Sequence, residues 1–140
     1  MQFGPGLRQW DELGRSLDRL VKATGASFAV VMDESNDLWC WSRGLDREDE
    51  APFLLLDRAL SATDVPLRRG GRIDTLKSDF AARSFAAIYL LILSFDRLGE
   101  PFQIRKEIAE ALPEIEALTL ALPPPDGPDA TAGVAALQKK

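Results

Sequence analysis

The feature that most constrains the fold is the apolar run 88–93, IYLLIL, which lies inside the segment from Gly71 to Phe95. Successive side chains of a β-strand point to opposite faces, so a run without polar alternation needs cover on both sides. We therefore predict a strand buried at the centre of a sheet. The segment around it contains short strands joined by tight connections and no catalytic group.

The length and composition predict one ordinary globular domain. A chain of 140 residues hides roughly two thirds of its unfolded surface on folding. Hydrophobic residues make up 46% and charged residues 28%, which is typical of globular proteins. We expect the domain to span 1–122. The Pro-, Ala- and Gly-rich tail 123–140 is predicted to be disordered.

Charge and hydropathy predict a cytoplasmic protein that binds neither nucleic acid nor membranes. The net charge of -5 argues against non-specific nucleic-acid binding, which needs a basic surface. The longest apolar stretch, 85–93, is far shorter than the ~20 residues of a membrane-spanning helix. The N-terminus shows no secretory pattern.

The residues that usually carry catalysis are scarce. The chain has no histidine, which removes Ser-His and Cys-His pairs and the commonest zinc ligand. Cys40, the single cysteine, has no cationic neighbour to activate a thiolate, and we expect it to pack in the core. The acidic segment 46–50 is interpreted as a helix start. We predict a non-enzymatic protein with no catalytic residues, cofactor or metal site.

The first hairpin turn has a partial likeness to a calcium loop. Asp33, Ser35 and Asp37 alternate like the first ligands of such a loop. However, Leu38 stands where glycine is required and Gly44 where the bidentate glutamate should be. A hairpin turn is the better interpretation.

Hydrophobic periodicity predicts an α+β order of elements. In the second strand we expect Trp39 and Trp41 on one face, and Leu38 and Cys40 on the other. Pro113 should kink or restart the last helix. The expected elements are a helix over 7–24, strands over 27–32 and 38–43, a helix over 52–60 with 46–50 in its first turn, an edge strand over 72–80, strands over 82–86 and 88–95, and a helix after Pro101 whose stripe is Phe102, Ile104, Ile108, Leu112, Ile115 and Leu118.

Three groups of residues are candidates for binding a partner. The helix over 52–60 is apolar around its circumference, and a partner subunit would cover its second side. Trp39 and Trp41 form either an aromatic platform for a partner or part of the core. The loop 68–72 with its Gly70–Gly71 pair is either a charged connection or a site for an anion or acidic partner. That site would use Arg68, Arg69 and Arg72, and it matches neither phosphate-loop nor dinucleotide fingerprints.

The order of elements resembles the roadblock/LC7 family, a relative of the longin domains. Three pieces carry the resemblance over most of 7–120: LGRSLDRLVKATGASFAVVMDESNDLWCWSR, RIDTLKSDFAARSFAAIYLLILSFD and IRKEIAEALPEIEAL. The resemblance implies an α/β (α+β) domain with a mostly antiparallel five-stranded sheet, two helices on one face and one on the other. The turn DESND lacks the family's frequent glycine, and Pro113 interrupts its last helix.

The resemblance also implies how such a protein would act. Roadblock proteins are non-enzymatic homodimers or heterodimers, and bacterial members commonly bind small Ras-like GTPases or other roadblock-type subunits. In that family the second helix and the following edge strand form the dimer contact. In this sequence the corresponding positions are Phe53, Leu56, Ala59, Leu60, Ile73, Thr75 and Leu76.

A GAF-like small-molecule sensor is the alternative. Such a domain also combines an opening helix with an antiparallel sheet. It would need a roomy apolar pocket with a few convergent polar groups. The connection over 61–71 looks short for the elements that usually roof such a pocket.

Overall fold

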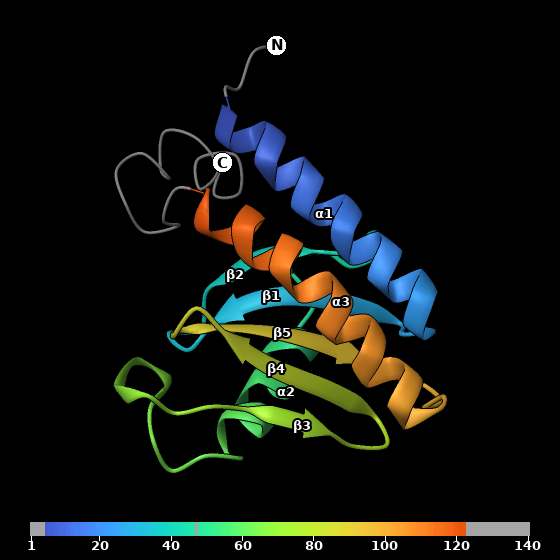
Figure 1. The fold of residues 1–140 in the computed structure, drawn as a ribbon, viewed down its shortest axis with the longest axis vertical. Helices are drawn as coiled ribbons and strands as arrows, with labels where there is room; N and C mark the ends of the chain where they lie inside the picture. Colours follow the sequence, from blue (N-terminus) through green and yellow to red (C-terminus); the bar gives the residue numbers. More distant parts are fainter. Residues whose placement is uncertain (1–4, 47, 123–140) are drawn as a thin grey trace.

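The computed structural model describes residues 5–46 and 48–122, and the predicted disordered tail lies outside them. Three helices and a five-stranded sheet form one α+β domain (Figure 1). No helix in the described ranges has the length and apolar character needed to cross a membrane. The elements are α1 (Pro5–Thr24), β1 (Phe28–Asp33), β2 (Leu38–Trp41), α2 (Ala51–Leu60), the 3₁₀-helix η1 (Leu67–Arg69), β3 (Asp74–Leu76), β4 (Phe80–Phe85), β5 (Tyr89–Ser94) and α3 (Pro101–Leu120).

The sheet places the apolar run at its centre, as predicted. Its strand order is β2-β1-β5-β4-β3, and all four pairings are antiparallel. Ile92 of β5 lies opposite Val30 of β1 on one side and Ala82 of β4 on the other. All four side chains over 90–93 have no exposed surface. The two strands predicted over 82–86 and 88–95 are the separate strands β4 and β5.

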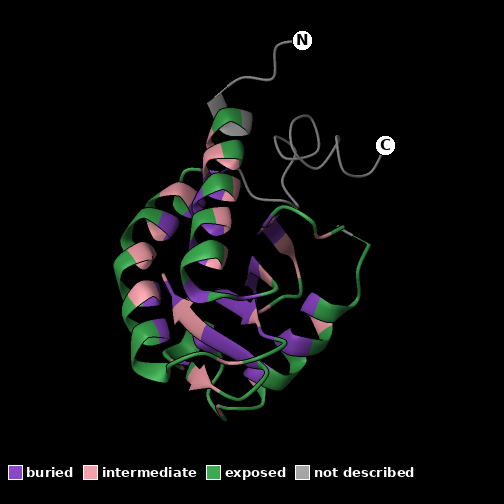
Figure 2. Cartoon of the chain, turned by 90° about the vertical axis from the view of Figure 1, so that its right-hand side faces the viewer, coloured by how far each residue is buried: buried purple, intermediate pink, exposed green. Residues whose placement is uncertain are grey.

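The helices cover the two faces of the sheet unequally. Helices α1 and α3 lie side by side over one face, and α2 covers the other (Figure 1). Figure 2 shows the buried residues along the sheet and on the inward sides of the helices, with exposed residues outside. This arrangement confirms the layers that the resemblance implied.

Helix α3 differs from its prediction at two positions. It is continuous from Pro101 to Leu120 and does not restart at Pro113. Pro113 lies on the exposed side, where water can solvate the carbonyl oxygen that loses its helical donor. Phe102 is 74% exposed, so its place in the buried stripe was wrong. It lies two residues before the buried Ile104, and such positions do not share a helix face.

The predicted alternation in β2 was also wrong, because a β-bulge interrupts the ladder. Val31 pairs with Cys40 and Met32 with Leu38, which leaves Trp39 as an extra residue. Consequently Trp39 and Cys40 both pack on the α1/α3 side, while Leu38 and Trp41 lie on the α2 side.

Two other segments are shorter than predicted. The strand expected over 72–80 is limited to β3, because the chain reverses over 77–79 and returns as β4. The amide of Lys77 donates to the carbonyl of Phe80 across this turn (2.8 Å). The acidic segment 46–50 precedes α2 rather than forming its first turn. Within it the Asp49 carboxylate accepts from the Asp46 amide (2.9 Å).

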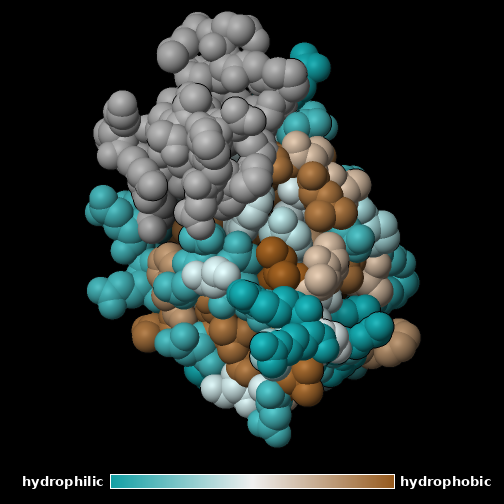
Figure 3. All heavy atoms as spheres, turned by 90° about the vertical axis from the view of Figure 1, so that its left-hand side faces the viewer, coloured by the Kyte–Doolittle hydropathy of each residue, from teal (hydrophilic) through white to brown (hydrophobic). Residues whose placement is uncertain are grey.

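The β1–β2 and β4–β5 turns and η1 gather at one end of the sheet (Figure 1). At the first turn Asn36 adopts a positive φ of 77°, which explains how this turn forms without glycine. At the second, Ala86 and Ala87 have φ values of 49° and 74°. Figure 3 looks at this end, and hydrophilic side chains cross the lower half of the view among apolar ones.

Candidate interaction surfaces

Helix α2 turns one stripe into the core and another outward. Pro52, Leu55, Leu56 and Ala59 are buried against the sheet, at the spacing of an inward helical face. Leu54 points away from the sheet and is 61% exposed. The outer side of α2 is therefore mixed, since the exposed Asp57 and Arg58 flank Leu54.

The seven residues expected at a dimer contact fall into two groups. Leu56, Ala59 and Ile73 are at most 2% exposed and belong to this chain's own core. The accessible residues lie on adjoining elements, the helix α2 and the edge strand β3. We define the α2–β3 surface as Leu54 with the half-buried Phe53, Leu60 and Thr75. Leu76 is also half-buried, but it packs on the opposite face of the sheet, towards α1 and α3.

An ion pair fixes α2 next to this edge. The Arg58 guanidinium donates two hydrogen bonds to the Asp79 carboxylate (2.6 and 3.1 Å) and lies 4.5 Å from the centre of the Phe80 ring. The hydrogen bond from Arg58 lowers the pKa of Asp79. The last turn of α2 is thereby tied to the β3–β4 turn.

The two tryptophans of β2 have different surroundings. Trp39 is 6% exposed, and its indole N–H donates to the Oδ2 atom of Asp33 (2.9 Å). Its ring meets that of Tyr89 edge-on at 5.2 Å. Trp41 is half-buried and lies edge-on to Trp10 at 5.4 Å. Trp41 is thus the tryptophan of this pair that a partner can reach.

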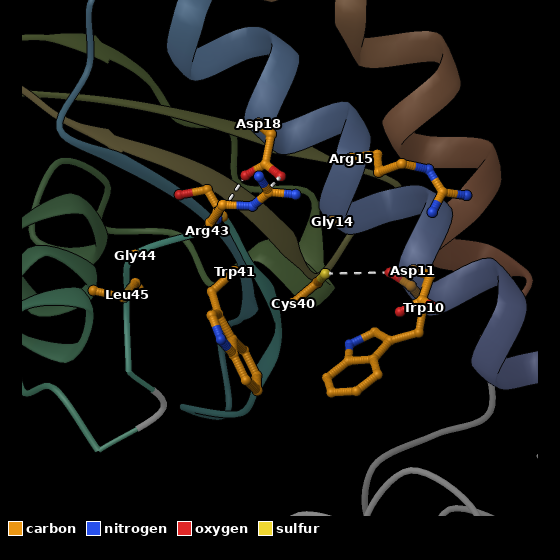
Figure 4. Close-up of a pocket in the computed structure, with 11 residues that line it drawn as sticks. Trp10, Asp11, Gly14, Arg15, Asp18, Cys40, Trp41, Arg43, Gly44 and Leu45 are labelled. Atoms are coloured by element: carbon orange, nitrogen blue, oxygen red, sulfur yellow. Dashed lines mark hydrogen bonds and ion pairs between the residues drawn. The ribbon is translucent and has the colours of Figure 1, made fainter. Parts of the chain in front are cut away.

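Trp10 and Trp41 line a surface hollow of about 530 Å³ between α1 and β2 (Figure 4). Asp18 accepts a hydrogen bond from the Arg43 amide (2.6 Å) at its rim. Burial raises the pKa of the Cys40 thiol in this wall to about 12, so the thiol is protonated at neutral pH. The hollow therefore contains no activated nucleophile. The described residues also contain no group of three or more potential metal ligands.

The arginines of the 68–72 loop have different roles. Arg68 bonds the Glu34 carboxylate through its Nε atom (2.8 Å), and the amides of Leu67 and Arg68 donate to the same carboxylate (both 2.9 Å). Arg68 therefore anchors η1 to the β1–β2 turn. Arg69 and Arg72 are exposed and have no ion pair within the described residues.

A second hollow, of about 550 Å³, opens beside this loop, and Arg72 and Arg83 both line it. Arg83 comes from β4 and is half-buried, and no described acidic side chain pairs with it. The one carboxylate in its lining, Asp74, faces Arg83 across the ladder but bonds Arg105 of α3 (2.7 Å).

Comparison with known proteins identifies the fold. No protein-family model and no curated protein matches the chain. The gliding protein MglB from Thermus thermophilus superposes with a TM-score of 0.60 at 12% identity, over 85% of this chain and 94% of that one. Myxococcus xanthus MglB gives 0.57 at 14% identity, over 79% and 97%. MglC from Myxococcus xanthus gives 0.53 at 17% identity, over 74% and 95%.

The chain has a roadblock-like fold. At 12 to 17% identity the likeness concerns the fold, and surfaces must be argued from this chain's own residues. Sequence reasoning about the roadblock-like domain missed Leu54 and Arg83. A signal for Arg83 was present, since it is the one charged residue of β4. Leu54 could not be separated from its apolar neighbours without the orientation of α2.

Proposed function

We propose that this roadblock-like domain is a cytoplasmic, non-catalytic regulator that forms a homodimer and presents a surface to a small Ras-like GTPase or to another roadblock-type subunit. The α2–β3 surface carries this proposal. An outward leucine on α2, beside a strand edge that no described residue pairs with, is an arrangement that a protein partner can cover.

Strand β3 supports an isologous contact. It has three residues and, among the described strands, it pairs only with β4, so its outer edge can offer backbone donors and acceptors to a second copy. Two copies joined along this edge would continue the sheet and bring their α2 helices together. Among the solved structures with this fold is MglB in a tetrameric arrangement, at a TM-score of 0.57 and 15% identity, which supports assembly as a mode of action.

The sensor alternative receives less support. A GAF-like site needs a roomy apolar pocket. The hollows of about 530 and 550 Å³ lie at the surface and are lined in part by charged side chains, including Asp18 and Arg43 in one and Arg72 and Arg83 in the other. We therefore favour the regulator.

Self-association is tested by sedimentation velocity of wild type and Leu54→Lys over micromolar to hundred-micromolar protein. We expect wild type to dimerise at tens of micromolar and Leu54→Lys to dissociate at least tenfold more readily, because a charge would be desolvated at the contact. Phe102→Lys is the matched control, since Phe102 is also exposed but lies on the opposite side of the sheet. A strictly monomeric wild type, or equal effects of both variants, would contradict the dimer.

The edge strand is tested separately with Leu76→Lys. Leu76 is half-buried on the α1/α3 face of β3, so the variant must first be shown to fold by circular dichroism. A lysine on this short edge strand should weaken pairing along it, and unchanged association would remove β3 from the interface.

The GTPase partner is tested by pull-down of the host's small GTPases loaded with GDP or with a non-hydrolysable GTP analogue. Selective capture of one nucleotide state is expected. A thermal-shift screen of nucleotides and metabolites runs in parallel. A strong shift there, without GTPase capture, would favour the sensor instead.

A further inference from the structure

The hollow beside η1 contains two guanidinium groups without acidic partners. Arg72 and Arg83 both line it and neither forms an ion pair with any described residue. Arg83 is half-buried, and a partly desolvated charge without a counter-charge costs free energy. An anion in the hollow would supply the missing counter-charge.

The other charges lining the hollow are already satisfied. Arg68 is held by Glu34 (2.8 Å), and Asp74 is held by Arg105 (2.7 Å). Each of these two pairs has no net charge. The remaining local charge is about +2, from Arg72 and Arg83, although the whole chain carries -5. The positive charge is therefore a local property of this hollow.

The walls that carry these groups are fixed by short-range contacts. The Ser84 hydroxyl accepts from the Ile73 amide (2.8 Å), and the Ser84 amide donates to the Ile73 carbonyl (2.9 Å), which joins the start of β3 to β4. A Cβ atom at Gly71 would lie 2.0 Å from the Val65 carbonyl oxygen. Gly71 thus lets the loop close tightly before Arg72. The two arginines therefore project from a constrained frame.

We propose that this hollow is a binding site for a phosphate group, held by Arg72 and Arg83. Two guanidinium groups balance a phosphate, which carries about -1.5 to -2 charge at neutral pH, better than they balance one carboxylate. Arginine also offers the paired N–H donors that match phosphate oxygens. A volume of about 550 Å³ leaves room for either free phosphate or a small phosphate ester. The proposal does not depend on dimerisation or on a GTPase partner.

The test is an NMR titration of the full chain with sodium phosphate and, separately, with glycerol 3-phosphate, at constant ionic strength set with sodium chloride. The arginine Nε–Hε signals are followed. We expect saturable shifts of the signals assigned to Arg72 and Arg83 with at least one of the two ligands. The two arms show whether free phosphate or the ester is preferred.

Arg72→Gln and Arg83→Gln should each weaken binding roughly tenfold or more, because each removes a charge-assisted contact. Arg69→Gln is the matched control. It removes the same charge from the same loop, but Arg69 does not line the hollow. Far-UV circular dichroism verifies the fold of each variant. If Arg83→Gln does not fold, the folded Arg72→Gln variant is enough for the test. Linear, non-saturating shifts with both ligands, or an equal loss in Arg69→Gln, would overturn the proposal.

Discussion

Two twenty-residue helices, α1 and α3, cover one face of the sheet, whereas α2, with ten residues, covers the other. On the first face Arg19 of α1 and Glu114 of α3 bridge the helices (2.6 Å). On the second face Leu54 of α2 points outward, and Phe28, Leu38, Trp41 and Leu45 are half-buried. Half-buried apolar residues also border the first face, so the two faces differ in the amount of helix that covers them. We propose the α2 side for a partner because one short helix covers it.

We expect the largest effects on stability from substitutions in the cores on the two faces of the sheet. Leu91 packs towards α1 and α3, Leu90 packs towards α2, and neither has exposed surface. Each change to alanine should reduce the free energy of unfolding by about 2–5 kcal/mol. We expect Leu91→Ala to lose more stability than Leu90→Ala. The joined helices α1 and α3 would leave the new cavity open, whereas the short helix α2 can move inward and partly fill it. Urea denaturation measures both, and a larger loss in Leu90→Ala would reverse the comparison.

The next comparison is between two neighbouring carboxylates. Asp33 accepts a hydrogen bond from Trp39, which packs on the α1/α3 side, and Glu34 accepts one from Leu67 in the loop that follows α2. Either change to alanine should cost about 1–3 kcal/mol. Asp33→Ala should cost more, because it leaves a buried indole N–H unpaired. Removal of Glu34 exposes amides that water can reach. Thermal unfolding measures which of the two variants loses more stability. Glu110→Ala, at an exposed position of α3, is a near-neutral control. Equal losses would mean that the two turns contribute alike.

The Glu34 contacts also predict a pH dependence. Burial raises the pKa of Glu34, but the hydrogen bonds from Arg68 and Leu67 together lower it by more. The pKa of Glu34 therefore lies below its ordinary value of 4.5. Because the folded pKa is depressed, the stabilisation is complete above the unfolded pKa and is lost as pH falls through the folded one. The stability gap between wild type and Glu34→Gln should be widest near pH 7 and shrink below about pH 4.5. Urea unfolding at several pH values measures this gap, and a gap independent of pH contradicts the assignment.

The smallest effect is expected at the β4–β5 turn, which joins strands that contribute to both faces. Ala87 has a φ of 74°, a conformation that costs an L-residue roughly 1–2 kcal/mol. Ala87→Gly relieves this strain but adds unfolded-state entropy, so a net gain of about 0.5–1 kcal/mol is expected. Ala23→Gly in α1 should instead lose about 0.5–1 kcal/mol. Differential scanning calorimetry compares the two, and a loss in Ala87→Gly would show that the turn is not strained.

Much of the architecture could be predicted, because the relevant signals are local. The run 88–93 predicted the central strand, the turn at 33–37 predicted the β1–β2 hairpin, and the break between the strands expected over 82–86 and 88–95 predicted the β4–β5 hairpin. The errors came from features without a local signal. The bulge at Trp39 depends on how β2 meets β1, and the length of β3 depends on where β4 pairs with it.

The candidate surfaces were predicted less well for the same reason. Sequence grouped Arg68, Arg69 and Arg72 as one basic loop. The structure binds Arg68 to Glu34, 34 residues away, leaves Arg69 outside the hollow, and places Arg72 and Arg83 in the lining of the same hollow. Such pairings depend on strand register, which no window of the sequence contains.

Local sequence signals were enough to predict an α+β domain around a central strand, because a run of six apolar residues must be covered on both sides and is short for a helix. The exposed side of α2 and the set of arginines that line one hollow followed only from the folded structure. Burial and ion pairing depend on contacts between distant segments, and those contacts exist only once the sheet has set their register.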